Sequence, residues 1–322
     1  MPSSLVRTFT DPDDYAASVR AASATLTITQ RGRFAAKLIR VDLHRLWMQR
    51  FSESLARVAY FSILPGRTSI SFAAQPGPVV VSGGFEQDGF SIVRRDGGQE
   101  YFHRTSAANC NCAVSLPVDE ITSLGTAIVG RDFTSAVTSA RLTARPAALT
   151  KLRKLHASAG HLAEYAPAVI AHPEAARGLE QALIEAMIGC LDGGEIHEDN
   201  AARRQHALIL RRFNRVVQEH SDQALYIPEL CRSVGVSERT LRVCCEEQLG
   251  MSPKRFLVLR RMSLARRALR ESAPAETTVT EVATRYGFWQ FGRFAGEYKA
   301  LFGELPSAML ARPPEERSSA AP

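Results

Sequence analysis

The feature that most constrains this chain is a repeat near its C-terminus. Ile227-Pro-Glu-Leu-Cys-Arg-Ser-Val-Gly235 aligns with Val279-Thr-Glu-Val-Ala-Thr-Arg-Tyr-Gly287, and Leu249-Gly250 matches Phe302-Gly303 further along. Each copy is typical of an amphipathic helix, a tight turn at glycine, and a second helix that ends at another glycine. The sequence therefore predicts two helix-turn-helix units in one chain.

The first copy has the signals that begin and end helices. Pro228 suits a first helical turn, Gly235 permits a left-handed stop, and Ser237 is a natural N-cap. Leu230, Cys231 and Val234 mark the buried face of the first helix, and the second helix is expected from about Glu238 to Leu249. Residues at the start of a recognition helix meet base edges in the major groove. The candidates for DNA contact are Ser237, Glu238, Arg239, Thr240, Arg242 and Val243.

The second copy is expected to read bases less directly. Thr278 and Glu281 have the spacing of a capping box. Phe294, Tyr298 and Leu301 should pack inward, which leaves a leading edge with few hydrogen-bonding side chains: Trp289, Gln290, Gly292, Arg293 and Glu297. We expect this edge to contribute backbone contacts and shape readout.

A basic amphipathic segment separates the two copies. From Pro253 to Arg270 a helix would span about 27 Å. It could hold two recognition helices near the roughly 34 Å spacing of successive major grooves. The candidates for phosphate contact are Lys254, Arg255, Arg261 and, in the second copy, Lys299.

These motifs resemble the DNA-binding domain of the AraC/XylS family of bacterial transcription regulators. The resemblance covers about a third of the chain, residues 207–310, and rests on Glu229–Leu241, Leu249–Pro253, Arg260–Leu269 and Val282–Pro306. It implies a seven-helix unit with two helix-turn-helix motifs on promoter DNA, with RNA polymerase as a partner. The chain departs from many relatives at Trp289, Phe291 and Gly292, where those carry polar residues.

The N-terminal half has a different period. Alternating strand-like segments run from about Ala22 to Leu116, punctuated by turns, and predict a small β-sandwich or barrel that is cupin-like. A helical stretch follows Pro117, and apolar steps of three and four predict a helical hairpin. We therefore expect an α+β chain with five parts: a β-rich domain (1–145), the hairpin (146–192), a linker (193–205), an all-α DNA-binding domain (206–311) and a disordered tail (312–322). The β-rich part resembles, less specifically, the effector-sensing or dimerisation domain of some family members.

Charge supports a polyanionic partner. The chain carries net charge +7, and from Arg211 onward it has 18 Lys+Arg against 13 Asp+Glu. A basic region of this kind is the electrostatic footprint of a nucleic-acid-binding module. No apolar run is long enough for a membrane span, and Asp11, Asp13 and Asp14 stand where a secretory signal would be apolar. Six cysteines without a disulfide framework favour the cytoplasm.

Three groups of residues allow more than one interpretation from the sequence. Cys110, Cys112 and His103 match no common zinc spacing, so buried thiols are favoured over a metal site. Cys244 and Cys245 could sense oxidation, although packing is favoured. His44, Trp47 and Met48 could line an effector cavity, although filling the sandwich is slightly favoured.

The sequence thus predicts a transcription regulator, favoured as an activator, that binds double-stranded promoter DNA, with a small-molecule effector and a homodimer as further candidates. No catalytic constellation, cofactor motif or metal pattern is visible. Two alternatives remain: a metal-dependent β-barrel enzyme with an accessory helical domain, and a DNA-binding or interaction module without sequence preference.

Overall fold

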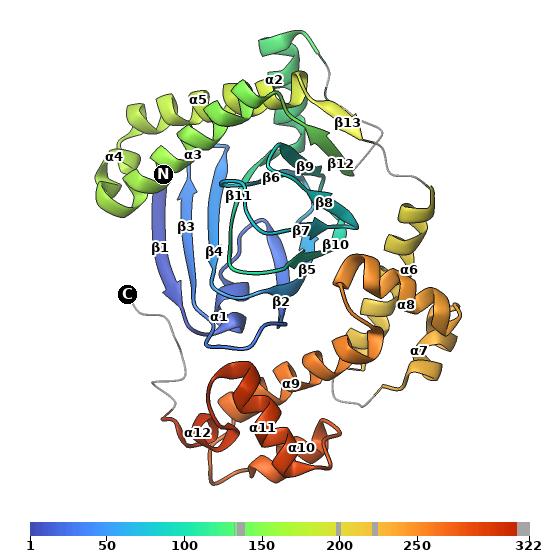
Figure 1. Ribbon diagram of the computed structural model, residues 1–322. Coiled ribbons are helices and arrows are strands. Elements are labelled where there is room, and N and C mark those ends of the chain that lie inside the picture. The colour runs from blue at the N-terminus through green and yellow to red at the C-terminus, as the bar shows by residue number, and fades with distance from the viewer. Residues whose placement is uncertain (132, 134–138, 198–200, 221–224, 314–322) are drawn as a thin grey trace.

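The computed structural model describes residues 1–131, 133, 139–197, 201–220 and 225–313. Its N-terminal half is a sandwich of two antiparallel sheets (Figure 1). In the described part of the chain the larger sheet has eight strands, in the spatial order β1 (Ser3–Phe9), β3 (Ala36–Asp42), β4 (Trp47–Glu53), β11 (Asn109–Pro117), β6 (Arg67–Ala73), β9 (Ser91–Arg95), β12 (Ser139–Thr143) and β13 (Glu195–His197). The smaller sheet has five, in the order β2 (Ala22–Ile28), β5 (Arg57–Ile63), β10 (Glu100–Thr105), β7 (Val80–Ser82) and β8 (Phe85–Gln87).

Helices cover the larger sheet and build the C-terminal half. Those of the first half are α1 (Pro12–Ala17), α2 (Val118–Val129), α3 (Pro146–Tyr165), α4 (Pro167–Ala171) and α5 (Pro173–Asp192). Those of the second half are α6 (Ala201–Glu219), α7 (Ile227–Val234), α8 (Glu238–Leu249), α9 (Pro253–Glu271), α10 (Val279–Arg285), α11 (Phe291–Phe302) and α12 (Pro306–Ala311). The predicted order, a β-rich sandwich with a helical hairpin followed by helices alone, is confirmed.

Strand alternation divides the buried side chains among three clusters. Ile39 on β3 faces outward and packs with the helices α2, α3 and α5. Leu38, its neighbour, faces the sandwich interior in a cluster that also contains Tyr298 of α11. Phe102 on β10 faces away from the interior and packs with helices α6 to α9. The hairpin therefore covers the outer face of the larger sheet, helices α6 to α8 cover the smaller sheet, and the helices α10 to α12 pack against the sandwich interior.

Several features lie outside the sequence expectations. Strand β1 and helix α1 precede Ala22, where the strand-rich region was expected to begin. A short helix, α4, stands in the turn of the hairpin, and β13 lies within the predicted linker and pairs with β12. Most of the predicted tail, residues 314–322, lies outside the described residues.

Candidate nucleic-acid interface

The first helix-turn-helix unit is built as its residues predict. Helix α7 ends at Gly235, whose φ of 77° is left-handed. Ser237 caps α8, because its Oγ accepts a hydrogen bond from the Thr240 N–H at 3.1 Å. Leu241 and Leu249 are fully buried on the inner face of α8, whereas Cys231 of α7 is only partly buried. The bounds of α8, Glu238–Leu249, agree with the predicted recognition helix.

The outer face of α8 presents the predicted readers to solvent. Arg239 and Arg242 are exposed, and Val243 is 46% exposed. Arg242 Nη2 lies 3.3 Å from Glu238 Oε1, with both side chains more than half exposed. A pair in that setting contributes only a few tenths of a kcal/mol, roughly. Arg242 can therefore leave Glu238 for a base edge or a phosphate at little cost.

The second unit differs at its leading edge. The predicted capping box of α10 is present: Glu281 N–H donates to Thr278 Oγ1 at 3.2 Å, and Thr278 N–H donates to Glu281 Oε2 at 2.7 Å. By contrast, α11 begins after Gln290, whose side chain makes no capping bond. Trp289 is 73% exposed just before the helix, and the structure adds Phe291, 42% exposed, to the predicted edge.

The remaining residues of that edge also face solvent. Gly292 is exposed, and Arg293 Nε donates to Glu297 Oε1 at 2.9 Å across one turn. Phe294, Tyr298 and Leu301 are buried on the opposite face, as predicted. The second unit thus offers an aromatic edge where the first offers arginines.

The candidate phosphate contacts divide into two groups. Lys254, Arg255 and Lys299 are exposed and free to meet a phosphate. Arg261 is half-buried: its Nη1 donates to the Tyr286 carbonyl at 3.5 Å, and its guanidinium lies 5.3 Å from the centre of the Phe288 ring. Burial lowers the pKa of Arg261. Arg261 therefore connects α9 to the second helix-turn-helix unit, in addition to carrying a positive charge.

Three further arginines of α9 pair with acids of the sandwich, and of these Arg267 stays 41% exposed. Arg266 Nη1 lies 2.8 Å from Asp11 Oδ2, and Arg270 Nη1 lies 2.8 Å from Asp11 Oδ1. Arg267 pairs with Asp13. From the sequence alone, no partner for these N-terminal acids is predicted in α9. Their charge complements the Arg266-Arg267-x-x-Arg270 run, but no local pattern indicates that segments about 255 residues apart meet.

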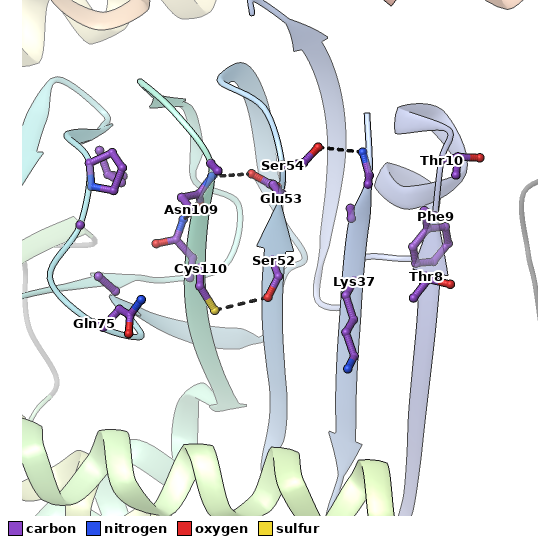
Figure 2. A pocket seen from close by; sticks show the side chains of 18 residues that line it. Thr8, Phe9, Thr10, Lys37, Ser52, Glu53, Ser54, Gln75, Asn109 and Cys110 are labelled. Carbon is purple, nitrogen blue, oxygen red and sulfur yellow. Dashed lines mark hydrogen bonds between the residues drawn. The ribbon is translucent and has the colours of Figure 1, made fainter. Parts of the chain in front are cut away.

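A cavity of about 730 Å³ opens on the rim of the larger sheet (Figure 2). Polar side chains from the strand ends line it, among them Thr8, Lys37, Ser52, Gln75 and Asn109. Two bonds tie this rim to helix α3. Lys37 Nζ lies 3.0 Å from Glu164 Oε2, and Arg153 Nε donates to the Ala73 carbonyl at 2.9 Å.

The interior of the sandwich, in contrast, is nearly full, with a void of only about 60 Å³. Arg57 donates to Glu53 Oε2 at 3.0 Å, and Tyr15 OH donates to Glu53 Oε1 at 3.0 Å. Burial, and then the charge of Arg57, lowers the pKa of His103 well below its usual value. The neutral imidazole can therefore accept the 2.6 Å bond from Arg57 Nη1 at Nδ1.

His44, Trp47 and Met48 lie in different surroundings. Trp47 borders the interior void, and its ring lies against two guanidinium groups. The ring centre is 3.8 Å from Arg20 Cζ and 3.5 Å from Arg67 Cζ. Met48 is fully buried in the core, and His44 is exposed. Among described residues, no group of three metal-ligating side chains stands together.

The cysteines stand in different surroundings. Cys112 is buried, and burial raises the pKa of its thiol. Cys110 is partly exposed in the rim cavity, with its Sγ 3.4 Å from Ser52 Oγ. Cys244 and Cys245 are buried under the first unit, and burial raises the pKa of both thiols, to about 11 for Cys244.

Comparison with known proteins assigns the helical region. Residues 230–312 match the family described as Helix-turn-helix domain. The chain is 45% identical over 98 residues to the "Probable thc operon regulatory protein" of Rhodococcus erythropolis, 30% of each chain. It is 34% identical over 121 residues to the "XylDLEGF operon transcriptional activator 3" of Pseudomonas putida, 37% of each chain. A probable AraC family transcriptional regulator from Rhodopseudomonas palustris is 31% identical over 33% of this chain and 98% of that one, with a TM-score of 0.30.

The C-terminal third of this chain is an AraC/XylS-type helix-turn-helix domain. The chain spans about a third of the length of the curated relatives it matches, so the likeness belongs to the AraC/XylS-type domain. The three matched proteins are named as regulators of transcription, and none of them as an enzyme. In the described part of the chain, every helix is too short or too polar to cross a bilayer.

Proposed function

We propose that the protein is a sequence-specific DNA-binding transcription regulator, an activator, that reads two successive major grooves. The observation that carries this proposal is the pair of helix-turn-helix units joined by α9, each with an exposed leading edge around Arg239 or Trp289. The aromatic edge of the second unit would read groove shape, and base edges would be read by Ser237, Glu238, Arg239, Thr240, Arg242 and Val243. Lys254, Arg255 and Lys299 would hold phosphates.

We place the effector site in the rim cavity. Ligand pockets typically measure about 300–1,000 Å³; the rim cavity lies in this range, whereas the sandwich interior is occupied by the Glu53–Arg57 network. A small molecule with an apolar body and hydrogen-bonding groups suits this lining. Its binding would shift the Lys37–Glu164 and Arg153–Ala73 contacts with α3, and so change how the DNA-binding domain is presented.

The remaining parts of the proposal follow from this role. An activator acts where promoter DNA and RNA polymerase are, which places it in the cytoplasm. The hairpin of α3 and α5 is the candidate surface for a homodimer. The domain boundaries expected from the sequence stay as proposed, with the effector-sensing part before residue 146 and the DNA-binding part from 206.

Selection from a randomised DNA library with the full chain, followed by nuclease footprinting on the enriched sequence, tests the main proposal. We expect protection across two adjacent major grooves, about 20 base pairs. At matched salt, the enriched duplex should bind more tightly than its scrambled version. Protection of a single groove, or equal affinity for both duplexes, would contradict the proposal.

The effector site is tested by blocking the cavity. A library of small molecules is screened for a rise in thermal midpoint, using the full chain and its Ser52→Trp variant. Hits should shift the wild-type midpoint and leave the variant unchanged, and they should alter affinity for the enriched duplex. An equal shift in both proteins would place the effector elsewhere. The midpoint of the variant without ligand reports whether it folds.

A further inference from the structure

Both recognition helices end against the sandwich. Helix α8 stops at Gly250 and α11 stops at Gly303, with left-handed φ values of 70° and 79°. At the C-terminus of a helix the last carbonyl groups lack intrahelical partners and carry partial negative charge. Each of these two ends contacts a segment of the sandwich that carries an arginine.

The end of α8 is held by β10. A Cβ added at Gly250 would lie 2.8 Å from Arg104 Nη1 and 2.9 Å from its Cδ, so a larger residue there would have to displace this side chain. Two neighbours extend the contact. The turn at Gly84 approaches Gln248, and the rings of Phe102 and Phe256 meet edge to face with centroids 6.0 Å apart.

The end of α11 is held by the loop between β2 and β3. A Cβ added at Gly303 would lie 2.7 Å from Arg33 Cγ and 3.5 Å from the Arg33 backbone nitrogen. Next to it, the Gly32 N–H donates to the Leu301 carbonyl at 3.2 Å. The loop thus supplies a donor to one of the last carbonyls of α11.

The two helix-turn-helix units have separate cores. Leu230 and Leu241 of the first unit belong to a cluster that includes Val58 and Phe102 of the smaller sheet. Phe294 and Tyr298 of the second belong to another cluster, which includes Leu26 and Leu38 of the sandwich interior. Helix α9 contributes to both clusters, so it and the sandwich together fix where one unit lies relative to the other.

We propose that Arg104 and Arg33 are positioning residues that hold the two recognition helices by their C-terminal ends. The sandwich, and not α9 alone, then sets the distance and angle between the two reading edges. This inference rests on the proposed function, because the spacing matters only if both edges meet one duplex. It also supplies a physical route by which a change in the sandwich reaches the DNA.

The first test measures the distance between the helices without DNA. Non-canonical spin-label residues at Glu246 and Gly296, both exposed, leave the native cysteines untouched. The wild type should give one narrow distance distribution, and the Arg104→Ala/Arg33→Ala double variant a clearly broader one. Arg131→Ala, which removes a side chain that is 63% exposed after α2, should match the wild type. Equal widths in the double variant and the wild type would overturn the proposal.

The second test uses glycines as matched variants. Gly235 has a φ of 77°, and an added Cβ would have nothing within 4 Å. Gly235→Ala therefore introduces backbone strain without any new steric contact. Gly250→Ala carries the same strain and also displaces Arg104. The loss of urea midpoint should therefore be larger for Gly250→Ala, and the excess should disappear when Arg104→Ala is added. An unchanged excess would show that Arg104 does not press on this site.

A DNA readout separates this proposal from the function on which it rests. Duplexes selected by the wild type are remade with the two half-sites one base pair further apart. The preference for the original spacing should fall roughly fivefold in the double variant, equivalent to about 1 kcal/mol. A retained preference would overturn the positioning role. If the wild type selects no sequence, the proposed function fails. The distance measurement, which needs no DNA, still tests whether Arg104 and Arg33 position the two helices.

Discussion

Arg266 Nη1 lies 2.8 Å from Asp11 Oδ2, and less than a tenth of either side chain is exposed. Asp11 also accepts a hydrogen bond from the Asp13 N–H at 2.8 Å and so caps α1. One carboxylate therefore begins the first helix of the sandwich and neutralises a buried cation of α9. Removing one partner of a buried pair leaves the other charge without compensation in a poor solvent.

The Asp11→Ala variant should therefore lose about 3 kcal/mol or more of unfolding free energy, with a further contribution of about 1 kcal/mol from the lost cap. Urea denaturation measures this loss. Glu174→Ala is the control, because its pair with Arg177 is more than two-thirds exposed on both sides, and it should change stability by less than about 0.5 kcal/mol. Similar losses in both variants would contradict a buried role for Asp11.

Stability should fall in mild acid because of His156. Burial, and then the charge of Arg50, lowers the pKa of His156 from its usual 6.5 to about 4. Between these values the unfolded chain binds the proton and the folded chain does not, so stability present above pH 6.5 is lost as the pH falls toward 4. The loss from this residue should reach about 3 kcal/mol at pH 4.

Urea midpoints across this pH range test the effect in the His156→Gln variant. Glutamine can still donate to the Gln49 carbonyl, as His156 Nε2 does at 3.2 Å, but it does not titrate. The variant should show a flatter dependence on pH, with His44→Gln, at an exposed site, as control. The buried His103 contributes in the same direction and should leave part of the slope in place. A slope equal to that of the wild type would rule out the role of His156.

Arg239 and Lys254 should differ in what they recognise. Arg239→Ala should weaken binding to the selected duplex by about 1–3 kcal/mol, and binding to random DNA much less, because arginine can hold a guanine edge with two bonds. Lys254→Ala should weaken both alike and flatten the salt dependence by about one unit, as a phosphate contact does. Fluorescence anisotropy over a salt series distinguishes the two, with Arg131→Ala, at a site 63% exposed after α2, as control. Equal losses on both duplexes for Arg239→Ala would refute base reading.

A substitution at Gln290, which does not cap α11 with its side chain, should change stability and DNA binding in opposite directions. Gln290→Ser should stabilise the protein by up to about 1 kcal/mol by supplying an N-cap. It should also weaken binding to the selected duplex if Gln290 contacts DNA. Ser237→Ala in the first unit, which removes a cap, should change stability in the opposite direction. Thermal midpoints and anisotropy measure both; a stabilised Gln290→Ser with unchanged affinity would remove Gln290 from the interface.

Local signals predicted the second half of the chain well. The bounds of α8 and the capping box at Thr278 follow from residues within one or two helical turns of each other, and neither needs a distant partner. The exposed edge at Arg239 follows from helical period in the same way. The assignment of individual residues to bases or phosphates remains a prediction.

Fewer features of the first half of the chain could be predicted from the sequence. The region of alternating strands was recognised, but β1 and α1 were not, because β1 has a single buried residue and α1 has only six residues. The rim cavity also could not be predicted from the sequence, because it forms only where the ends of β1, β3, β4 and β11 come together. The inward-facing Glu53–Arg57 pair breaks the rule that sandwich interiors are apolar.

The sequence by itself determined the two helix-turn-helix units, their caps and their left-handed glycines, because those depend on interactions between residues a few positions apart. Only the tertiary structure decided which arginines of α9 face solvent and which meet Asp11 and Asp13, and that Arg104 and Arg33 rest on Gly250 and Gly303. These contacts join segments more than a hundred residues apart. Their geometry comes from how whole layers pack, and no spacing within the chain encodes it.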